Sequence, residues 1–372
     1  MPQFDKIDPR IWDNVRVQDT GQKLDCLVWC QKGTQDSISC GDIIGRYPFL
    51  SAAGINTTYK HIYSLSDDLN VRFISSVQKA FVYMYQARSC VGVESLHDKR
   101  YSGKGTTIAV IDTGCDMHLD LVLGRNRIVR FVDFVNASAT PYDDNGHGTF
   151  VCGVLGGNGL CSNSRYRGVA PQCDIIVLKS LNQNGETQVF TILNAMQWII
   201  DHKIEYNIKV VCMSFGSEPY TKYDPLALGA EALWDNGIVV VCASGNDGPQ
   251  PNTVKSPAIS PKVLSVGSCN ANAGFVQSDF SSFGVYDGIT KPEILAPGEN
   301  INSLGNSGPY VTMSGTSVST PIVAGVVALL LEQNPNLTPN QIKNILISTS
   351  MRDKTGQHLI VNAYKAINYL KA

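Results

Sequence analysis

The sequence predicts a doubly wound α/β domain with a mostly parallel sheet, preceded by a small α+β unit built on an antiparallel sheet. From about residue 105 onward, short runs rich in Val and Ile alternate with helical stretches. Such near-continuous hydrophobic strands are typical of a parallel sheet covered on both faces. The chain before that point lacks this alternation, and 372 residues are enough for one large core and a second, smaller one.

The elements of the small unit come first. LDCLVWCQ is a strand candidate, followed by a weakly helical stretch, an alternating stretch over residues 59–76, a helical segment over residues 77–88 and a last strand candidate, CVGVES. This order favours an α+β unit on an antiparallel sheet. We predict two domains, residues 1–95 and 96–372.

The strands of the larger domain are predicted in six apolar runs. A helix is predicted over residues 187–203, because Val189, Leu193, Met196 and Ile200 recur at helical spacing. Alternating strands and helices imply right-handed crossovers, and such sheets bind their ligands outside the carboxyl ends of the strands. The runs are TTIAVIDTG, CDIIVLKSL, IKVVCMSFG, GIVVVCASGN, KVLSVGS and PEILAPG.

The composition excludes several classes of partner. The 30 Lys and Arg residues against 32 Asp and Glu leave a formal charge of −2, so no global field attracts nucleic acid or anionic lipid. The longest apolar run, residues 321–331, is shorter than the roughly 18 residues that suggest a membrane span. We expect no nucleic-acid partner and no membrane segment, and a homo-oligomer stays open.

The N-terminus and the cysteines predict a cytoplasmic protein. MPQFDKIDPRIWDN is polar and lacks the apolar core of a secretory signal. The 11 cysteines are odd in number and scattered, and several lie in apolar strand candidates, which favours reduced thiols. Cys26 and Cys30 have a loose metal-ligand spacing, but no second pair of ligands follows, so we predict no metal site there.

Four polar residues lie where strands end or helices begin. Asp112 ends a buried strand, His147 starts a helix after a glycine, Asn246 follows the strand VVVCASG, and Ser317 starts an apolar helix. A serine nucleophile needs a neutral imidazole to take its proton, and the imidazolium needs a buried carboxylate. The tetrahedral intermediate needs donors, here the Asn246 amide and the Ser317 backbone N–H. Together these residues predict acyl transfer.

Nine short motifs in order carry a resemblance to a known family. They are YSGKG, AVIDTG, HGT, YRGVAP, MSFGS, ASGN, LAPG, GTSVSTP and VNAYKAINYL. From about residue 101 to the C-terminus, the chain resembles the subtilisin-like serine proteases. The resemblance implies a serine endopeptidase acting on protein or peptide substrates, with Asp112, His147 and Ser317 as the triad and Asn246 in the oxyanion hole.

The resemblance also implies how a substrate binds. The peptide would lie as an added β-strand between two segments of this chain, held largely by main-chain hydrogen bonds. By position in the family's motifs, the two segments are Ser214, Phe215 and Gly216 on one side and Gly185, Glu186 and Thr187 on the other.

The sequence departs from the family pattern in several places. Phe150 follows HGT where the family often has histidine, and residues 315–319 read GTSVS; neither removes a catalytic group. The stretch GGNGLCSNSRYRG lacks the loop of a tight calcium site, which puts that ion in doubt. Lys255 falls where the family often has a glycine at the floor of the specificity pocket. An inward ammonium would favour an acidic or polar substrate side chain, whereas a lysine more often turns outward to water.

The N-terminal unit resembles, more weakly, the family's inhibitory prodomain, whose C-terminal tail lies in the active site. At the junction, CVGVES is the last strand of this unit, or VGVESLH is the first helix of the protease. We expect an autoinhibited zymogen, with its own prodomain as a partner, that cleaves itself within residues 87–100.

Two other functions compete with this interpretation. Asp-Thr-Gly occurs at residues 19–21 and 112–114, as in an aspartic protease, but α/β alternation is wrong for that all-β fold. A subtilisin-like chain also serves as a catalytically silent scaffold, or stays inhibited by its prodomain. The complete set of catalytic residue types argues for activity.

Overall fold

The chain forms two compact units, Met1–Phe81 and Val82–Ala372. The boundary predicted between residues 95 and 96 is therefore too far toward the C-terminus. The protein is described here by a computed structural model, in which the described residues are 4–8, 11, 23–76, 83–219, 223–306, 308 and 310–371. The first Asp-Thr-Gly, residues 19–21, lies outside the described residues.

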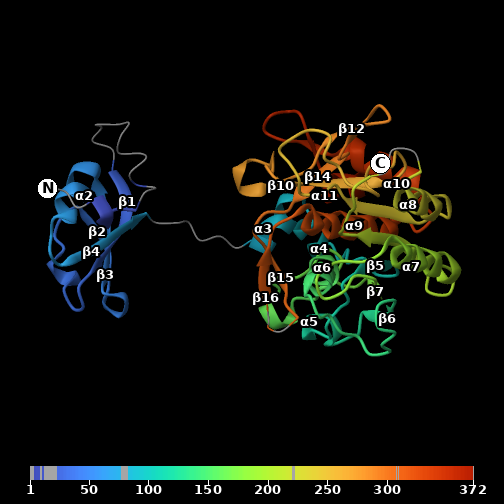
Figure 1. Cartoon of the computed structure of the whole chain (residues 1–372), viewed down its shortest axis with the longest axis horizontal. Helices are drawn as coiled ribbons and strands as arrows, with labels where there is room; N and C mark the ends of the chain where they lie inside the picture. Colours follow the sequence, from blue (N-terminus) through green and yellow to red (C-terminus); the bar gives the residue numbers. More distant parts are fainter. Residues whose placement is uncertain are drawn as a thin grey trace. The chain divides into compact units, whose positions relative to one another are not determined.

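The smaller unit is a four-stranded antiparallel sheet in the order β2-β3-β1-β4 (Figure 1). Two local expectations are wrong. Strands β2 and β3 occupy the stretch expected to be weakly helical, and helix α2 occupies the first half of the alternating stretch, where it buries Ile62 and Leu65. The elements are Phe4–Lys6 (η1), β1 Lys23–Cys30, Gln35–Ser37 (η2), β2 Asp42–Tyr47, Pro48–Leu50 (η3), β3 Ala52–Thr58, α2 Tyr59–Ser66 and β4 Val71–Ser76.

Two helices after residue 82 explain the position of the boundary. Helices α3 (Tyr83–Cys90) and α4 (Glu94–Asp98) belong to the larger unit, because Val91, Val93 and Leu96 are fully buried in its hydrophobic core. CVGVES therefore forms no strand, and the alternative that VGVESLH is a first helix is correct only in part, because residues 94–97 lie in α4, the second helix of the larger unit.

The larger unit is built on a ten-stranded, mostly parallel sheet, as predicted. Its strand order is β17-β18-β14-β10-β9-β8-β5-β7-β6, with β11 paired to β10. Strands β6 and β7 lie on one side of β5, and β8 and β9 lie on its other side. The direction in which strands are added therefore reverses between β5 and β8. The strands are β5 Thr107–Asp112, β6 Ile128–Asp133, β7 Asp174–Lys179, β8 Ile208–Met213, β9 Val239–Ala243, β10 Leu264–Asn270, β11 Val276–Gln277, β14 Ile294–Pro297, β17 Met351–Arg352 and β18 Leu359–Ile360.

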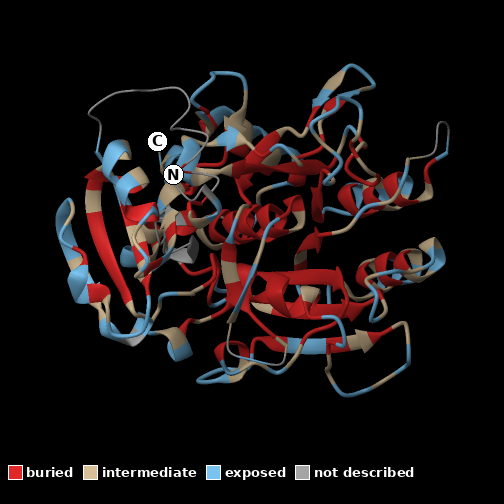
Figure 2. Ribbon diagram, turned by 60° about the vertical axis from the view of Figure 1, so that its left-hand side comes forward, coloured by how far each residue is buried: buried red, intermediate tan, exposed pale blue. Residues whose placement is uncertain are grey.

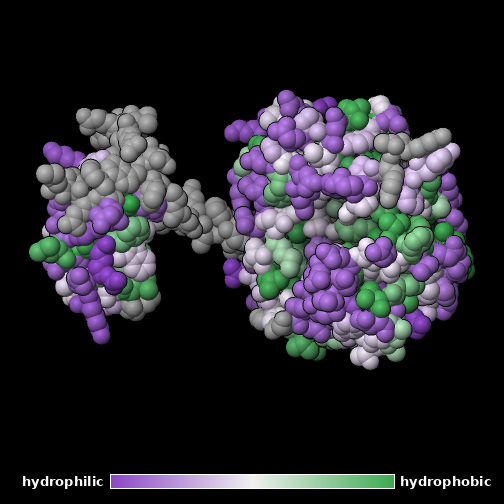
Figure 3. All heavy atoms as spheres, in the orientation of Figure 1, coloured by the Kyte–Doolittle hydropathy of each residue, from purple (hydrophilic) through white to green (hydrophobic). Residues whose placement is uncertain are grey.

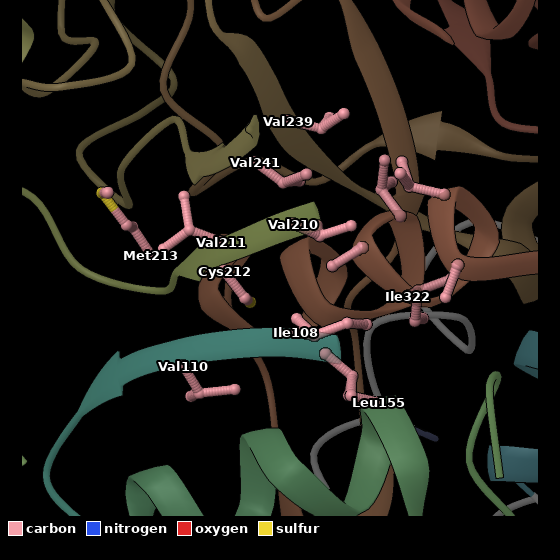
Figure 4. Close-up of a cluster of buried hydrophobic side chains, with 14 of the residues drawn as sticks. Ile108, Val110, Leu155, Val210, Val211, Cys212, Met213, Val239, Val241 and Ile322 are labelled. Atoms are coloured by element: carbon pink, nitrogen blue, oxygen red, sulfur yellow. The ribbon is translucent and has the colours of Figure 1, made fainter. Parts of the chain in front are cut away.

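Helices cover both faces of this sheet. Every residue of β5 and β9 is buried, as Figure 2 shows for the centre of the unit. Helices α6 (His147–Gly156) and α9 (Thr316–Gln333) pack together against the strands, as do α7 (Val189–His202) and α8 (Pro225–Asp235). In Figure 4, Leu155 of α6 and Ile322 of α9 join side chains of β5, β8 and β9 in one core.

Helix α9 is the one described helix that is long and apolar enough to cross a membrane, but 83% of its apolar window is buried inside the unit, as in a core helix. On the face of the larger unit seen in Figure 3, hydrophobic residues are scattered among hydrophilic ones. The remaining elements are α5 Leu119–Val122, Leu160–Ser162 (η4), Ala271–Ala273 (η5), β12 Gly284–Tyr286, β13 Ile289–Lys291, β15 Ile301–Leu304, β16 Tyr310–Met313, α10 Pro339–Thr349 and α11 Ala363–Tyr369.

Candidate active site

Asp112 is the last residue of β5, at the point where the strand order reverses. Ligands of doubly wound sheets bind at this kind of switch point. The Asp112 side chain is 2% exposed, and its Oδ1 accepts hydrogen bonds from the backbone N–H of Thr113 at 2.8 Å and from His147 Nδ1 at 2.7 Å. Its Oδ2 is buried with no hydrogen-bond partner among the described residues. The carboxylate is therefore held toward the imidazole.

His147 is the first residue of α6, and its side chain is 26% exposed. Because Nδ1 donates to Asp112, the neutral ring presents the lone pair of Nε2 on its other side. Burial acts to lower the pKa of His147, but the negative charge of Asp112 and its hydrogen bond together raise it more, so the pKa lies above its usual value. The ring thus has the tautomer and basicity of a general base.

Close backbone contacts bring the two segments together and explain their glycines. A Cβ atom at Gly148 would lie 2.1 Å from the carbonyl oxygen of Gly114, and one at Gly114 would lie 2.2 Å from that of Tyr142. Thr113 bridges the segments, since its Oγ1 accepts from the Gly148 N–H at 2.9 Å. Any larger side chain at either glycine would separate Asp112 from His147.

Asp143 also holds this turn, and the sequence analysis missed it. Its carboxylate accepts from the backbone N–H groups of Gly146 and Thr149, both at 2.8 Å, and from the Thr113 hydroxyl at 2.9 Å. Burial acts to raise the pKa of Asp143, but these hydrogen bonds lower it more, so the carboxylate stays charged. The signal for it was an aspartate shortly before a helix start, the usual place for a capping side chain.

Ser317 and Asn246 lie together at the start of α9. A Cβ atom at Gly315 would lie 3.0 Å from Ser317 Oγ and 3.5 Å from Asn246 Nδ2. No hydrogen bond joins Ser317 to His147 in the described part of the chain. In unliganded enzymes such bonds are often long and tighten only when the substrate binds. Helix α6 begins at His147 and helix α9 begins one residue before Ser317, and the two helices pack against one another.

Thr316 orients the Asn246 amide. Asn246 Oδ1 accepts from the Thr316 backbone N–H at 2.9 Å and from its hydroxyl at 3.0 Å. The amide oxygen is thereby occupied, and Nδ2 remains to donate on the Ser317 side. The Ser317 backbone N–H lies in the first turn of α9, where it has no helical acceptor. These two donors face the region beside the Ser317 hydroxyl.

Of the two predicted substrate segments, one follows β8 and the other is joined to the His147 loop. Residues 214–216 directly follow β8, and Ser217 pairs with Ser256 through two backbone hydrogen bonds of 2.9 Å. Residues 185–187 belong to a turn closed by the Asn182 N–H donating to the Glu186 carbonyl at 2.9 Å. This turn lies beside the His147 loop, since Asn145 Nδ2 donates to the Gln183 carbonyl at 3.0 Å.

Lys255 lies between Gly216, which follows β8, and Gly245, which follows β9. A Cβ atom at Gly216 would lie 2.6 Å from Lys255 Cβ, and one at Gly245 would lie 2.8 Å from its Cγ. Its ammonium makes close ion pairs with Glu218 and Asp247, two residues that the sequence analysis did not identify. The side chain is 15% exposed. It points neither into an empty pocket nor freely to water.

The loop that lacks the calcium motif, residues 156–168, has one buried carboxylate against it. Asp120 is the buried carboxylate that contacts it, and both of its oxygens accept hydrogen bonds, from the Cys161 N–H at 2.7 Å and the Tyr310 hydroxyl at 2.8 Å. The Arg127 guanidinium also donates to the Asp120 carbonyl. Among the described residues, no group of three or more His, Cys, Asp or Glu could hold a metal ion, and Cys26 and Cys30 belong to no such group.

Comparisons of sequence and of structure with known proteins match this chain to subtilisin-like serine proteases. The family model described as the subtilase family matches residues 103–365. Serine protease AprX of Bacillus subtilis is 41% identical over 273 residues, which cover 66% of this chain and 61% of AprX. Subtilisin E of the same organism is 31% identical over 83% of this chain and 78% of its own. A crystal structure of a cold adapted subtilisin-like serine proteinase matches with a TM-score of 0.60 and 31% identity, covering 71% of this chain and 90% of that one.

Proposed function

The chain belongs to the subtilase family, and from this premise we propose that it is a serine endopeptidase whose triad is Ser317, His147 and Asp112. The observation that carries the proposal is the 2.7 Å hydrogen bond from His147 Nδ1 to the buried Asp112 carboxylate, at the switch point of the sheet. The serine and the amide expected of such a site lie together at the start of α9.

The proposed reaction follows from these positions. Ser317 Oγ attacks the peptide carbonyl while His147 Nε2 takes its proton, and Asp112 stabilises the imidazolium that forms. Asn246 Nδ2 and the Ser317 backbone N–H donate to the oxygen of the tetrahedral intermediate. The imidazolium then protonates the leaving amine, which departs and leaves an acyl-enzyme. Water activated by His147 cleaves the ester bond and restores the Ser317 hydroxyl.

A fluorophosphonate probe tests the nucleophile directly. We expect one label per chain, located at Ser317 by peptide mass mapping, because only this serine is proposed to have a base and an oxyanion hole. Labelling measured before and after limited proteolysis of residues 1–81 separates an active, a latent and a silent protein. Absence of labelling in both states would favour the silent scaffold, and inhibition by pepstatin instead would favour an aspartic protease.

We further propose that protein or peptide substrates bind as an added strand between residues 214–216 and 185–187. Lys255 narrows the pocket between Gly216 and Gly245, while Glu218 and Asp247 together exceed its charge. This balance removes the reason to expect an acidic substrate side chain. The pocket instead suits a small or basic residue before the scissile bond.

Lys255→Ala tests this pocket. Removing the stem frees volume and leaves two uncompensated carboxylates, so we expect kcat/KM for substrates with Phe or Lys before the scissile bond to rise about tenfold. A panel of peptides differing only at that residue measures it. Lys262→Ala, which removes a lysine paired with Asp235 at the surface, is the matched control. An unchanged profile, or wild-type preference for Leu, Phe or Tyr, would contradict the proposal.

We propose that the protein is made as a zymogen inhibited by residues 1–81, which resemble a prodomain. The expected cleavage window of residues 87–100 needs correction, because it spans the end of α3, the connection after it and α4, and includes the buried Val91, Val93 and Leu96. Cleavage there would unfold part of the core of the larger unit. Self-cleavage is therefore proposed N-terminal to α3, outside the described residues.

Mass spectrometry of the purified full chain tests self-processing. We expect the wild-type protein to lose its N-terminal unit on incubation and to show a new N-terminus before Tyr83, whereas Ser317→Ala keeps its full mass. Identical intact masses for both proteins after long incubation would count against self-cleavage.

All 11 cysteines are free thiols, and seven are buried in the two cores. Burial raises the pKa of Cys173 to about 12, so this thiol is unreactive at neutral pH. The unpaired thiols support a reducing compartment, and we propose a cytoplasmic location. A homo-oligomer also remains a proposal, and we assign no interface residues to it.

A further inference from the structure

A cavity in the larger unit, which includes none of the proposed catalytic residues, is lined by cationic side chains. Its volume is about 550 Å³. Arg100 and His97 come from the segment before β5, Arg125 and Arg127 from the segment before β6, and Arg167 from the loop after α6. None of the described residues that line it is Asp or Glu. The subtilase family assignment does not explain this cavity.

The arginines are poorly neutralised. Arg125 pairs with Asp174 at 2.5 Å. Arg167 donates to the Ser164 hydroxyl at 2.8 Å, and Arg127 donates to the Asp120 carbonyl, both neutral acceptors. Within the described ranges, Arg100 has no side-chain partner, and neither it nor Arg127 or Arg167 forms an ion pair. Three guanidinium charges around the cavity therefore have no paired carboxylate.

Two residues of the lining, Arg127 and His97, each have a buried nitrogen atom with no hydrogen-bond partner in the described part of the chain, and neither atom is itself open to the cavity. Arg127 is 3% exposed, and its Nε has no hydrogen-bond partner among the described residues. His97 Nε2 lies 2.9 Å from the Val169 carbonyl, so it carries the proton, and Nδ1 is left without a partner. Buried polar groups in proteins are normally hydrogen-bonded, so Arg127 and His97 are incompletely satisfied residues of the cavity wall. Burial also lowers the pKa of Arg127, since nothing nearby compensates its desolvation fully.

We propose that this cavity binds an anion that carries a phosphoryl group. Guanidinium groups bind phosphate oxygens in bidentate pairs, and several arginines need more acceptor oxygens than one carboxylate offers. A terminal phosphoryl group supplies three acceptor oxygens that share its negative charge, one more than a carboxylate. The volume exceeds that of a single phosphate ion, so the ligand includes a further phosphoryl group or an organic body.

Calorimetric titration of the full chain tests the proposal, with Ser317→Ala present in every protein so that the chain stays intact. The probes are inorganic phosphate and tripolyphosphate, with sodium chloride at matched ionic strength as the blank. We expect one saturable site and a higher melting temperature with either probe. Arg100→Gln, at an exposed position with no side-chain partner, should weaken binding about tenfold. Tighter binding of tripolyphosphate would assign the extra volume to further phosphoryl groups.

Arg130→Gln is the matched control, because Arg130 is exposed on β6 but does not line the cavity. We expect it to bind both probes like the parent protein. The proposal is overturned if neither probe saturates, or if Arg130→Gln weakens binding as much as Arg100→Gln, which would indicate only general charge screening. Neither readout depends on peptidase activity, so the outcome is independent of the proposed function.

Discussion

Replacing Ser317 with alanine is expected to lower kcat by about a million-fold, a magnitude established for subtilisin and carried over rather than calculated for this chain. The substitution removes the only atom proposed to bond covalently to the substrate. The oxyanion donors Asn246 Nδ2 and the Ser317 backbone N–H stay in place, because α9 and the Thr316 bonds to Asn246 do not involve the hydroxyl. KM should therefore change little. Burst and steady-state kinetics with a chromogenic peptide measure both constants.

Ser319→Ala is the matched control for this prediction. Ser319 lies in the same helix, two residues on, and its buried hydroxyl donates to the Ala296 carbonyl at 2.9 Å. Losing that bond should cost about 1 kcal/mol of stability and leave kcat within a few-fold of wild type. A Ser317→Ala protein that retained more than about one hundredth of the activity would exclude Ser317 as the nucleophile.

The large sheet could be predicted because its strands are apolar throughout. β5 and β9 are buried at every position, so burial on two faces leaves a continuous run of Val, Ile and Ala that is hard to mistake. The polar residue that ends such a run then marks the edge of the sheet. Asp112 was found in this way, and the same reasoning located Asn246 just beyond β9.

The small unit was harder to predict, since its strands are not apolar runs. β3 reads AAGINTT, with residues of low strand propensity, and it is a strand because it pairs with β1 on one side and β2 on the other. The prediction of the domain boundary was wrong for a similar reason. Val91 and Leu96 show which unit they belong to only through core partners far away in the sequence.

The missed residues of the site do not share one physical cause. Asp143 caps a turn a few residues away, which a local signal could have identified, whereas Glu218 and Asp247 act through a contact that chain proximity does not reveal. Glu218 and Asp247 belong to different segments and meet only at the Lys255 ammonium. A charged side chain has no periodic pattern that predicts its partner, so the neutralisation of Lys255 required the three-dimensional structure.

Asp112→Asn is expected to lower kcat about 10⁴-fold, a size carried over from other Ser-His-Asp proteases. The asparagine amide would donate to the His147 ring rather than accept from it, which favours the tautomer with the proton on Nε2. That tautomer cannot take a proton from Ser317. The buried Oδ2 has no partner among the described residues, so the amide nitrogen gains no alternative acceptor there.

The pH profile distinguishes this electrostatic role from simple damage to the fold. In wild type, the negative Asp112 raises the pKa of His147, so kcat/KM should fall as the pH drops through a value above that of ordinary histidine. Without that charge the pKa of His147 falls, and the acid limb of the residual activity should move to lower pH. Asp116→Asn removes a charge from the same loop, where the carboxylate accepts from the Met117 N–H, and should leave the limb in place. If Asp112→Asn loses activity while its acid limb stays with that of wild type, then Asp112 does not set the charge state of His147. In that event the triad proposed here is wrong even though its residues lie side by side.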